Sequence, residues 1–235
     1  FDKKGRGVVN MQEVLNQSLN TGAVFVEQKL GKEKFNNYMM SFGVGEKTGI
    51  DLPNETKGLV DNFKKGDMEY ANMSFGQGIA LTPIEAARAF SVLANGGNLI
   101  KPHLVDEIKY NEGGSKKISY NDSISVIQPK TSEEISKMLV TVFDNYLGGN
   151  AKIAGYSIAA KTGTAQVSKE DGGGYYTDRH LHSFFGYFPA YDPQFLILLY
   201  TNNPKGVNFA SQTLINPFID ITKFLISYYE VAPDR

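Results

Sequence analysis

The segment Lys161-Thr162-Gly163-Thr164 combines a cation, two hydroxyls and a glycine within a stretch whose alternating pattern predicts a β-strand. Lysine and glycine fit poorly in a strand if packing is the only requirement. Successive side chains of a strand point to opposite faces, so Lys161 and Gly163 lie on one side and both threonines on the other. A single ligand can contact both sets of side chains only if it binds along an exposed edge of the strand. An extended peptide would bind such an edge through its main chain and place a carboxylate near the lysine. The alternative interpretation is a surface strand with a solvated lysine and a bulge at the glycine.

Ser18-Leu19-Asn20 is a second candidate, and on its own it carries little information. Serine and asparagine often occupy interruptions between helices, because their side chains hydrogen-bond to the nearby backbone. Taken alone, the segment is interpreted as a turn-prone loop. Lys161 follows Ser18 by 143 positions, and the two segments become informative only as a pair.

Capping signals place this serine between two helices. Asn10, with Glu13 at the third helical position, predicts a helix start, and the polar run 16–22 interrupts that helix. Helical character resumes from Ala23 to Leu30 and again from Lys32 to Phe42. A long surface loop is expected over residues 43–67, where glycine, proline and lysine recur without a period.

The strongest local signal is Thr82-Pro83-Ile84-Glu85, a capping box with proline at the first helical position, which predicts a helix to Leu93. A hairpin around residues 112–115 and an amphipathic helix from Thr131 to Tyr146, capped near Ser132, are expected next. The later segments comprise three β-rich stretches and a closing helix, at residues 155–167, 182–191, 194–201 and 214–231. Helices in the middle with strands clustered late predict an α+β layered fold and not a βαβ repeat.

The amino-acid composition argues against several classes of partner and of site. The 235 residues are 41% hydrophobic and 21% charged, as in an ordinary globular protein with enough apolar material for a core. The 24 basic and 25 acidic residues leave no net field to attract nucleic acid or an anionic lipid surface. The absence of cysteine excludes disulfides, a thiolate zinc site and a cysteine nucleophile. The longest apolar run, residues 195–200, is far shorter than the ~18 residues needed to span a bilayer.

Together, Ser18-Leu19-Asn20 and Lys161-Thr162-Gly163-Thr164 resemble the second and third motifs, S-x-N and K-T-G, of the penicillin-binding transpeptidases. The resemblance extends from Asn10 to about Pro204 and is to the monofunctional, class B branch. The other stretches that carry it are Asn10-Met11-Gln12-Glu13, residues 42–53, Gly76-Gln77-Gly78, Thr82-Pro83, residues 93–97 and Lys101-Pro102-His103. It implies an αβα sandwich of the β-lactamase/transpeptidase type, an antiparallel sheet flanked by helices. Residues 1–235 are then expected to be the C-terminal portion of one such domain, without its N-terminal helix and first strands.

The resemblance also implies acyl transfer through a serine nucleophile in the family's first motif, S-x-x-K. None of the 20 lysines has a serine three residues before it, so the chain contains no S-x-x-K. Family order places that motif upstream of Phe1, and we expect this chain to be inactive by itself. Ser18 is disfavoured as a substitute nucleophile, because the only cation that the motifs offer it is Lys161.

By similarity, the remaining motif residues take distinct roles in the site. Ser18 relays a proton to or from the reacting amine, and Asn20 hydrogen-bonds the backbone carbonyl of the donor peptide. Lys161 holds Ser18 electrostatically and biases its proton affinity. Thr162 binds the terminal carboxylate of the substrate beside Gly163, and the backbone N–H of Thr164 forms half of an oxyanion hole.

The activity implied is that of a peptidoglycan D,D-transpeptidase that cross-links stem peptides ending in D-Ala-D-Ala and is acylated by β-lactams. The resemblance also implies a place outside the cytoplasmic membrane, an upstream anchoring helix and a glycosyltransferase partner, with no cofactor. A D,D-carboxypeptidase, in which water replaces the acceptor amine, and a β-lactam sensor domain are the alternatives. The stretches 42–53 and 76–97 favour a class B cell-wall synthase, that is, the transpeptidase, over the sensor domain.

His180 and His182 share a face of an expected strand and superficially suggest a metal site. No cysteine or paired carboxylate completes a ligand set, and the resemblance places a histidine at the start of this strand. A structural role is therefore expected for His182, and no metal.

Overall fold

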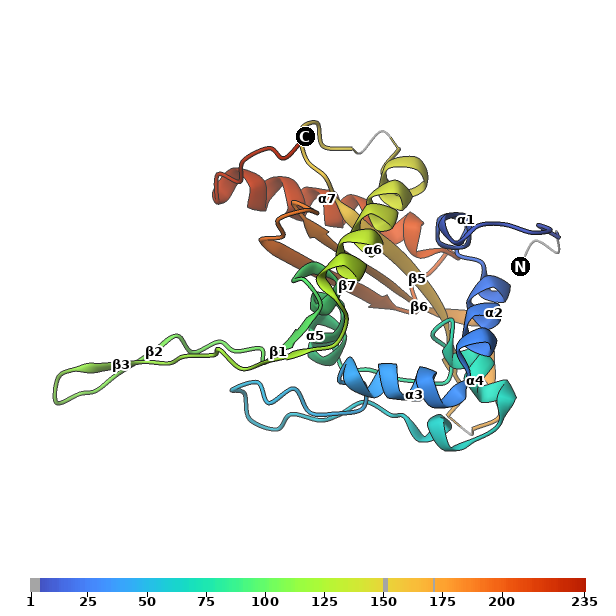
Figure 1. Ribbon diagram of the computed structural model, residues 1–235, viewed down its shortest axis with the longest axis horizontal. Coiled ribbons are helices and arrows are strands. Elements are labelled where there is room, and N and C mark those ends of the chain that lie inside the picture. Colours follow the sequence, from blue (N-terminus) through green and yellow to red (C-terminus); the bar gives the residue numbers. More distant parts are fainter. Residues whose placement is uncertain (1–4, 150–151, 171) are drawn as a thin grey trace.

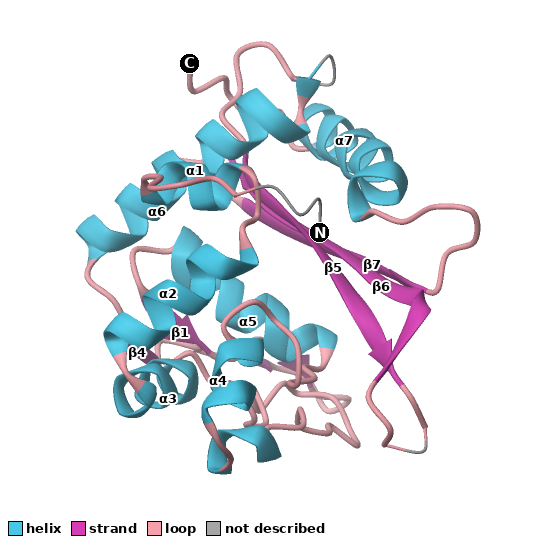
Figure 2. Cartoon of the chain, turned by 90° about the vertical axis from the view of Figure 1, so that its right-hand side faces the viewer, coloured by secondary structure: helices cyan, strands magenta, loops and turns pink. Residues whose placement is uncertain are grey.

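A three-stranded antiparallel sheet in the order β5-β6-β7 forms the centre of the computed structural model, which describes residues 5–149, 152–170 and 172–235. Its strands are β5 (Ala159–Ser168), β6 (Tyr175–Phe188) and β7 (Phe195–Asn202). Helix α7 (Ala210–Tyr228) covers one face, and α5 (Pro83–Ala94) and α6 (Pro129–Val142) cover the other (Figures 1 and 2). This arrangement confirms the expected α+β fold with helices on both sides of an antiparallel sheet.

Side-chain alternation along the strands explains the two helical layers. On the α7 side, alternate residues of β5 and β6 form one core cluster with the helix, including Ala160, Phe184 and Phe218. The intervening residues pack toward α6 in a second cluster, which includes Ala159, Tyr187 and Leu139. All of these side chains are buried, so the hydrophobic effect holds each layer to its own face of the sheet.

Short helices form a lobe beside the sheet. They are α1 (Met11–Asn16), α2 (Asn20–Leu30), α3 (Lys32–Ser41), η1 (Asp61–Lys64) and α4 (Asp67–Met73). The expected cap of α1 is confirmed, because the side chain of Asn10 accepts a hydrogen bond from the N–H of Glu13 at 2.9 Å. Helix α2 begins at Asn20, three residues earlier than expected, so the interruption between α1 and α2 is only a short turn.

The capping box of α5 is confirmed, and its glutamate reaches well beyond the helix. Glu85 is 1% exposed, and its carboxylate accepts hydrogen bonds from the backbone N–H groups of Gly45, Gly58 (2.9 Å) and Thr82 (3.2 Å). No room exists for a larger residue at Gly58, where a Cβ would lie 2.3 Å from the carbonyl oxygen of Ala80. One buried carboxylate therefore fixes the long loop expected over residues 43–67 against the start of α5.

The expected hairpin projects from the body as an arm (Figure 1). At its base, β1 (Asn98–Ile100) pairs with β4 (Ser123–Ser125), and further out β2 (Glu107–Lys109) pairs with β3 (Ser115–Lys117). The turn lies at the predicted glycines, since Tyr110 N–H donates to the carbonyl of Gly114 at 3.1 Å. The pairing of β1 with β4 was not predicted.

The starts of α6, β5, β6 and α7 also differ from those predicted, and β5 begins at Ala159, four residues after the expected start. Helix α6 starts at Pro129 rather than near Ser132, whose buried hydroxyl instead donates to the carbonyl of Leu93 at 2.7 Å, and it continues into a wide turn, η2 (Phe143–Leu147). Strand β6 begins at Tyr175, seven residues before the expected start. Helix α7 begins at Ala210, four residues early, because the side chain of Gln212 caps it by accepting from the N–H groups of Asn208 and Phe209.

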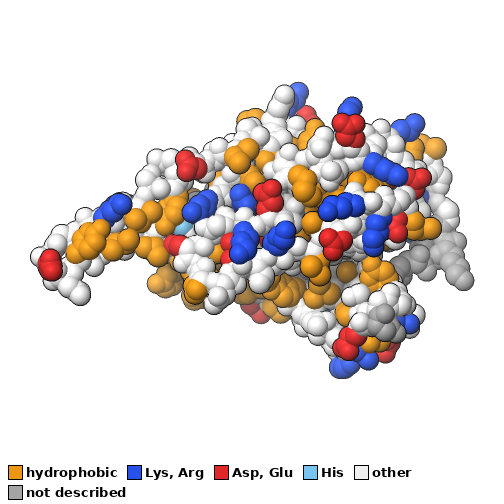
Figure 3. Space-filling model, turned by 90° about the horizontal axis from the view of Figure 1, so that it is seen from below, with side chains coloured by type: hydrophobic (Ala, Val, Ile, Leu, Met, Phe, Trp, Pro, Cys, Tyr) orange, Lys and Arg blue, Asp and Glu red, His pale blue; other side chains and the backbone are white. Residues whose placement is uncertain are grey.

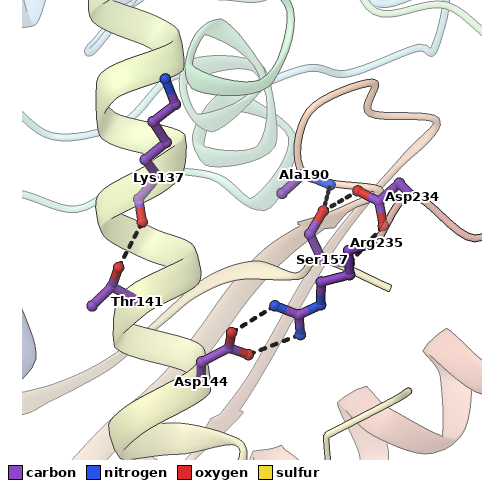
Figure 4. A network of polar contacts seen from close by, with 7 residues as sticks. All are labelled: Lys137, Thr141, Asp144, Ser157, Ala190, Asp234 and Arg235. Carbon is purple, nitrogen blue, oxygen red and sulfur yellow. Dashed lines mark hydrogen bonds and ion pairs between the residues drawn. The ribbon is translucent and has the colours of Figure 1, made fainter. Parts of the chain in front are cut away.

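The C-terminal residues close over the end of the sheet (Figure 4). The guanidinium of Arg235 donates to both carboxylate oxygens of Asp144, at 2.6 and 3.0 Å, and this pairing raises the pKa of Arg235. The carboxylate of Asp234 accepts from the backbone N–H of Ser157 at 2.7 Å and from its hydroxyl, while Ser157 Oγ accepts from Ala190 N–H at 2.9 Å. The network ties the chain end to η2 and to the entry of β5. Within the described ranges, no helix has the length and apolar character to cross a membrane.

Candidate active site

Ser18 lies in the turn between α1 and α2 with a backbone conformation that is unusual for serine. Its φ is 53°, in the left-handed region that non-glycine residues seldom occupy. The turn is closed by hydrogen bonds from Ser18 N–H to Leu15 O at 3.2 Å and from Leu19 N–H to Val14 O at 2.9 Å. A Cβ at Gly22 would lie 2.6 Å from both methyl groups of Val14, so this glycine lets α2 approach α1. The strained serine is therefore held by the packing of two helices.

Lys161 reaches this serine from the sheet. Its Nζ donates to Ser18 Oγ at 3.0 Å and to the carbonyl of Thr162 at 3.2 Å. The side chain is half-buried, and burial lowers the pKa of Lys161 to about 8. No carboxylate lies within 4.0 Å of this ammonium in the part of the chain that the structure describes. The amine can therefore both hold the serine hydroxyl and exchange a proton near neutral pH.

Strand β5 is the edge of the described sheet and pairs only with β6. Lys161 points to the helical lobe, whereas Thr164 lies on the α7 side, where its hydroxyl oxygen accepts from the N–H of Ala210 at 3.1 Å. The two sets of side chains thus lie on opposite faces, as strand geometry predicts. Only the unpaired edge of β5 is shared by both.

Ser183 and His182 of the neighbouring strand β6 lie opposite Gly163 and Thr164 of this edge. Gly163 lies opposite Ser183, and a Cβ at the glycine would be 2.5 Å from Ser183 Oγ, so a side chain there would displace the strand. His182, opposite Thr164, is fully buried, and its Nδ1 lies 3.0 Å from the hydroxyl of Thr213. Burial lowers the pKa of His182, which keeps the ring neutral in the core. No group of three or more metal-ligating side chains is assembled within the described residues.

The structure adds positions that sequence reasoning did not connect to the site. The amide of Asn62 donates to the carbonyl of Gly78, and Tyr175 OH would lie 3.9 Å from a Cβ at that glycine. The Gly76-Gln77-Gly78 turn thus lies near the hairpin that joins β5 to β6. The Ala210–Thr164 contact was also missed, since a backbone donor leaves no signal in residue types. Asn20 is the first residue of α2, two positions after Ser18, and its substrate contact stays a prediction.

Comparisons with known proteins agree with one another. The family model for the penicillin-binding protein transpeptidase domain matches residues 1–221. The chain is 37% identical to stage V sporulation protein D of Bacillus subtilis over 93% of its own length and 34% of that protein. It is 32% identical to a peptidoglycan D,D-transpeptidase FtsI homolog of Mesostigma viride, over 96% of this chain and 41% of that protein.

Solved structures show the same fold. Penicillin-binding protein 3 of Mycobacterium tuberculosis, determined in complex with ampicillin, superimposes with a TM-score of 0.87 at 26% identity, over 96% of this chain and 52% of that one. The transpeptidase domain of penicillin-binding protein 3 from Burkholderia pseudomallei gives a TM-score of 0.82 at 25% identity, over 100% of this chain and 69% of that one. The chain spans 34% and 41% of the length of the two curated relatives described above.

Proposed function

The chain belongs to the family of penicillin-binding protein transpeptidase domains, and from this premise we propose that it supplies the proton-relay and substrate-binding half of a peptidoglycan D,D-transpeptidase. The nucleophilic serine is contributed by an S-x-x-K segment outside these 235 residues. The observation that carries the proposal is the contact of Lys161 Nζ with Ser18 Oγ at 3.0 Å, across 143 positions of sequence, in a chain without S-x-x-K.

The reaction proposed is attack of that serine on the carbonyl carbon of the penultimate D-Ala, with departure of the terminal D-Ala. Ser18 passes a proton to the leaving amine and later takes one from the acceptor amine. Lys161 keeps the hydroxyl of Ser18 oriented, and its pKa of about 8 lets it share in the relay near neutral pH.

The free edge of β5 holds the substrate in this proposal. The donor peptide adds alongside β5 through main-chain hydrogen bonds. Thr162 binds the terminal carboxylate, Gly163 lets the peptide approach, and Asn20 binds a backbone carbonyl. The N–H of Thr164 supplies half of the oxyanion hole, so the described residues alone form an incomplete catalytic site.

The cellular setting is proposed from the family resemblance. The full-length protein is anchored in the cytoplasmic membrane by an upstream helix, carries this domain on the outer face, and works with a polymerising glycosyltransferase. β-Lactams react with the same serine as the stem peptide. The names of two relatives, stage V sporulation protein D and an FtsI homolog, fit a role in cell-wall synthesis.

The test is acylation of the full-length protein by fluorescent penicillin. Lys161→Ala should slow acylation by about 10²- to 10⁴-fold, the usual contribution of a positioned acid–base group. Lys169→Ala is the matched control, since Lys169 is exposed just beyond the end of β5. Equal acylation rates for both variants would remove Lys161 from the site.

A second assay separates the transpeptidase from the carboxypeptidase. It follows the acyl group of a D-Ala-D-Ala peptide in the presence of an amine acceptor. Transfer to the amine supports the transpeptidase, whereas release to water alone would make the protein a carboxypeptidase. Stable acylation by penicillin with no turnover of the peptide would instead indicate a sensor domain.

A further inference from the structure

Among the residues that the structure describes, backbone groups on the outer edge of β2 in the arm have no hydrogen-bond partner. The bonds that join β2 to β3 come from even-numbered residues, since Ile118 N–H donates to Asp106 O at 2.9 Å and Tyr110 N–H donates to Gly114 O at 3.1 Å. In an antiparallel ladder the intervening residues point their N–H and C=O groups to the other side. The backbone groups of Glu107 therefore face away from β3, and so do those of Lys109.

Side-chain contacts anchor the base of the arm. Val105 donates its N–H to the carboxylate of Asp51 at 2.8 Å. The same carboxylate accepts from Leu104 N–H at 2.8 Å, and Tyr120 OH donates to Val105 O at 2.9 Å. The stacking of His103 on Tyr120, with ring centroids 3.7 Å apart, adds a further contact. The outer edge of β2 thus begins just beyond a base that these contacts anchor.

Two copies of this edge carry complementary charges when they pair antiparallel. If two copies of Glu107-Ile108-Lys109 run antiparallel about a two-fold axis at Ile108, each Glu107 lies opposite Lys109 of the other copy. These are also the residues with outward-facing backbone groups, so both pairs are of the hydrogen-bonded kind. Opposite charges in directly facing positions stabilise a strand pair. The backbone hydrogen-bonding pattern and the facing charges therefore favour the same alignment of the two strands.

The edge of β3 does not share this property. Its residues Ser115-Lys116-Lys117 would bring Lys116 opposite Lys116 under the same symmetry, and like charges facing each other destabilise a pair. Charge also argues against a lipid surface as the partner, because residues 101–125 carry four basic and four acidic side chains.

Exposure of the arm provides the driving force. Ile108 is 43% exposed and Tyr110 is 53% exposed, and both lie on one face of the ribbon. Figure 3 shows hydrophobic side chains along the arm, with no neighbouring element covering them in that view. A two-stranded ribbon gains little stability alone, whereas three or more strands with an apolar face are stable.

We propose that β2 is a self-association edge, which pairs antiparallel with β2 of a second copy of this chain to form a four-stranded ribbon sheet. Ile108 of each copy lies at the two-fold axis, and the charged pair Glu107–Lys109 repeats on either side of it. The interface is isologous, since the same edge serves both copies. It leaves the free edge of β5 open, so the substrate site stays accessible in the dimer.

A single cysteine introduced at position 108 tests the proposed two-fold axis. Non-hydrogen-bonded residues that face each other across antiparallel strands have Cα atoms about 4.5 Å apart, within the range of a disulfide. These 235 residues contain no cysteine, so Ile108→Cys introduces one reporter thiol into the chain. In the full-length protein, mild oxidation should link Ile108→Cys into a dimer. Lys116→Cys, at the equivalent position on β3, should stay unlinked, as should the unsubstituted protein. No linked dimer from Ile108→Cys, or equal linking of both variants, would overturn the proposal.

Mixed charge variants test the register independently of folding. In the Ile108→Cys background, Lys109→Glu alone leaves two glutamates on the edge and Glu107→Lys alone leaves two lysines. Each should link at least about tenfold less than the parent, because both facing pairs become like-charged. A one-to-one mixture restores opposite charges in both pairs and should give a heterodimer. Failure of the mixture to recover linking would refute the register.

Discussion

Replacing Lys161 with methionine should stabilise the fold at neutral pH, while it removes the amine to which we assign a share in the proposed proton relay. Lys161 is half-buried without a carboxylate partner among the described residues, and burial lowers its pKa from 10.5 to about 8. Because folding lowers this pKa, the charged form of Lys161 makes the folded state less stable than a neutral side chain would. At about 1.4 kcal/mol per unit, the difference of about 2.5 units corresponds to about 3 kcal/mol. Residual solvent contact and the lost hydrogen bonds to Ser18 and Thr162 reduce the expected net gain to about 1–2 kcal/mol.

The pH dependence gives the sign of this effect. The pKa in the folded state lies below that in the unfolded state, so between about pH 8 and 10.5 the unfolded chain binds more protons. The penalty is complete below pH 8, fades as the pH rises toward 10.5, and is absent only above 10.5, where lysine is neutral in both states. The advantage of methionine over lysine should therefore be greatest near neutral pH and shrink in alkaline buffer.

Urea unfolding of the full-length protein and of Lys161→Met at about pH 7 and about pH 10 measures both quantities. Lys169→Met is the matched control, since replacement of an exposed lysine should change the free energy of unfolding by less than about 0.5 kcal/mol. Lower stability of Lys161→Met at neutral pH, or an advantage that does not change with pH, would refute the burial argument.

Three further predictions concern the packing that positions the site. Gly22→Ala should lower the free energy of unfolding by about 1–3 kcal/mol, because the added methyl group overlaps Val14. In thermal unfolding, the double variant Gly22→Ala/Val14→Ala should recover part of the stability that Gly22→Ala loses, whereas additive losses would contradict the contact. Glu85→Ala should cost at least about 2 kcal/mol in chemical unfolding, because three backbone N–H groups lose their acceptor, and a loss below about 0.5 kcal/mol would show that water replaces the carboxylate. Asp144→Asn should cost about 1 kcal/mol at low salt and less at high salt, since its pair with Arg235 is partly exposed; a salt-independent loss would argue against an ionic contribution.

Local sequence rules predicted the elements with strong capping or turn chemistry. The start of α1 at Asn10, the capping box of α5 and the glycine turn of the arm each depend on one or two neighbouring side chains, and all three are confirmed. The start of α6 was predicted wrongly because Ser132 resembles a cap in sequence, yet tertiary packing uses its hydroxyl to satisfy the carbonyl of Leu93. Proline at the first helical position was the better signal there.

Long-range features of the site needed the fold. Strand alternation correctly separated Lys161 from Thr164, but no local pattern could show that the amine reaches Ser18, since the contact joins a turn and a strand 143 positions apart. The left-handed φ of Ser18 and the Ala210–Thr164 bond were likewise invisible, because both depend on backbone geometry. Only the family resemblance connected the two motifs before the structure did.

The location of the acylated serine tests the central claim most directly. The full-length protein is labelled with a β-lactam, digested, and the adduct is mapped by mass spectrometry. We expect the adduct on a serine outside residues 1–235, within an S-x-x-K segment, and none on Ser18 or any other residue of this chain. An adduct on Ser18, or on any serine between Phe1 and Arg235, would contradict the proposal that this chain supplies the relay and the substrate edge but not the nucleophile.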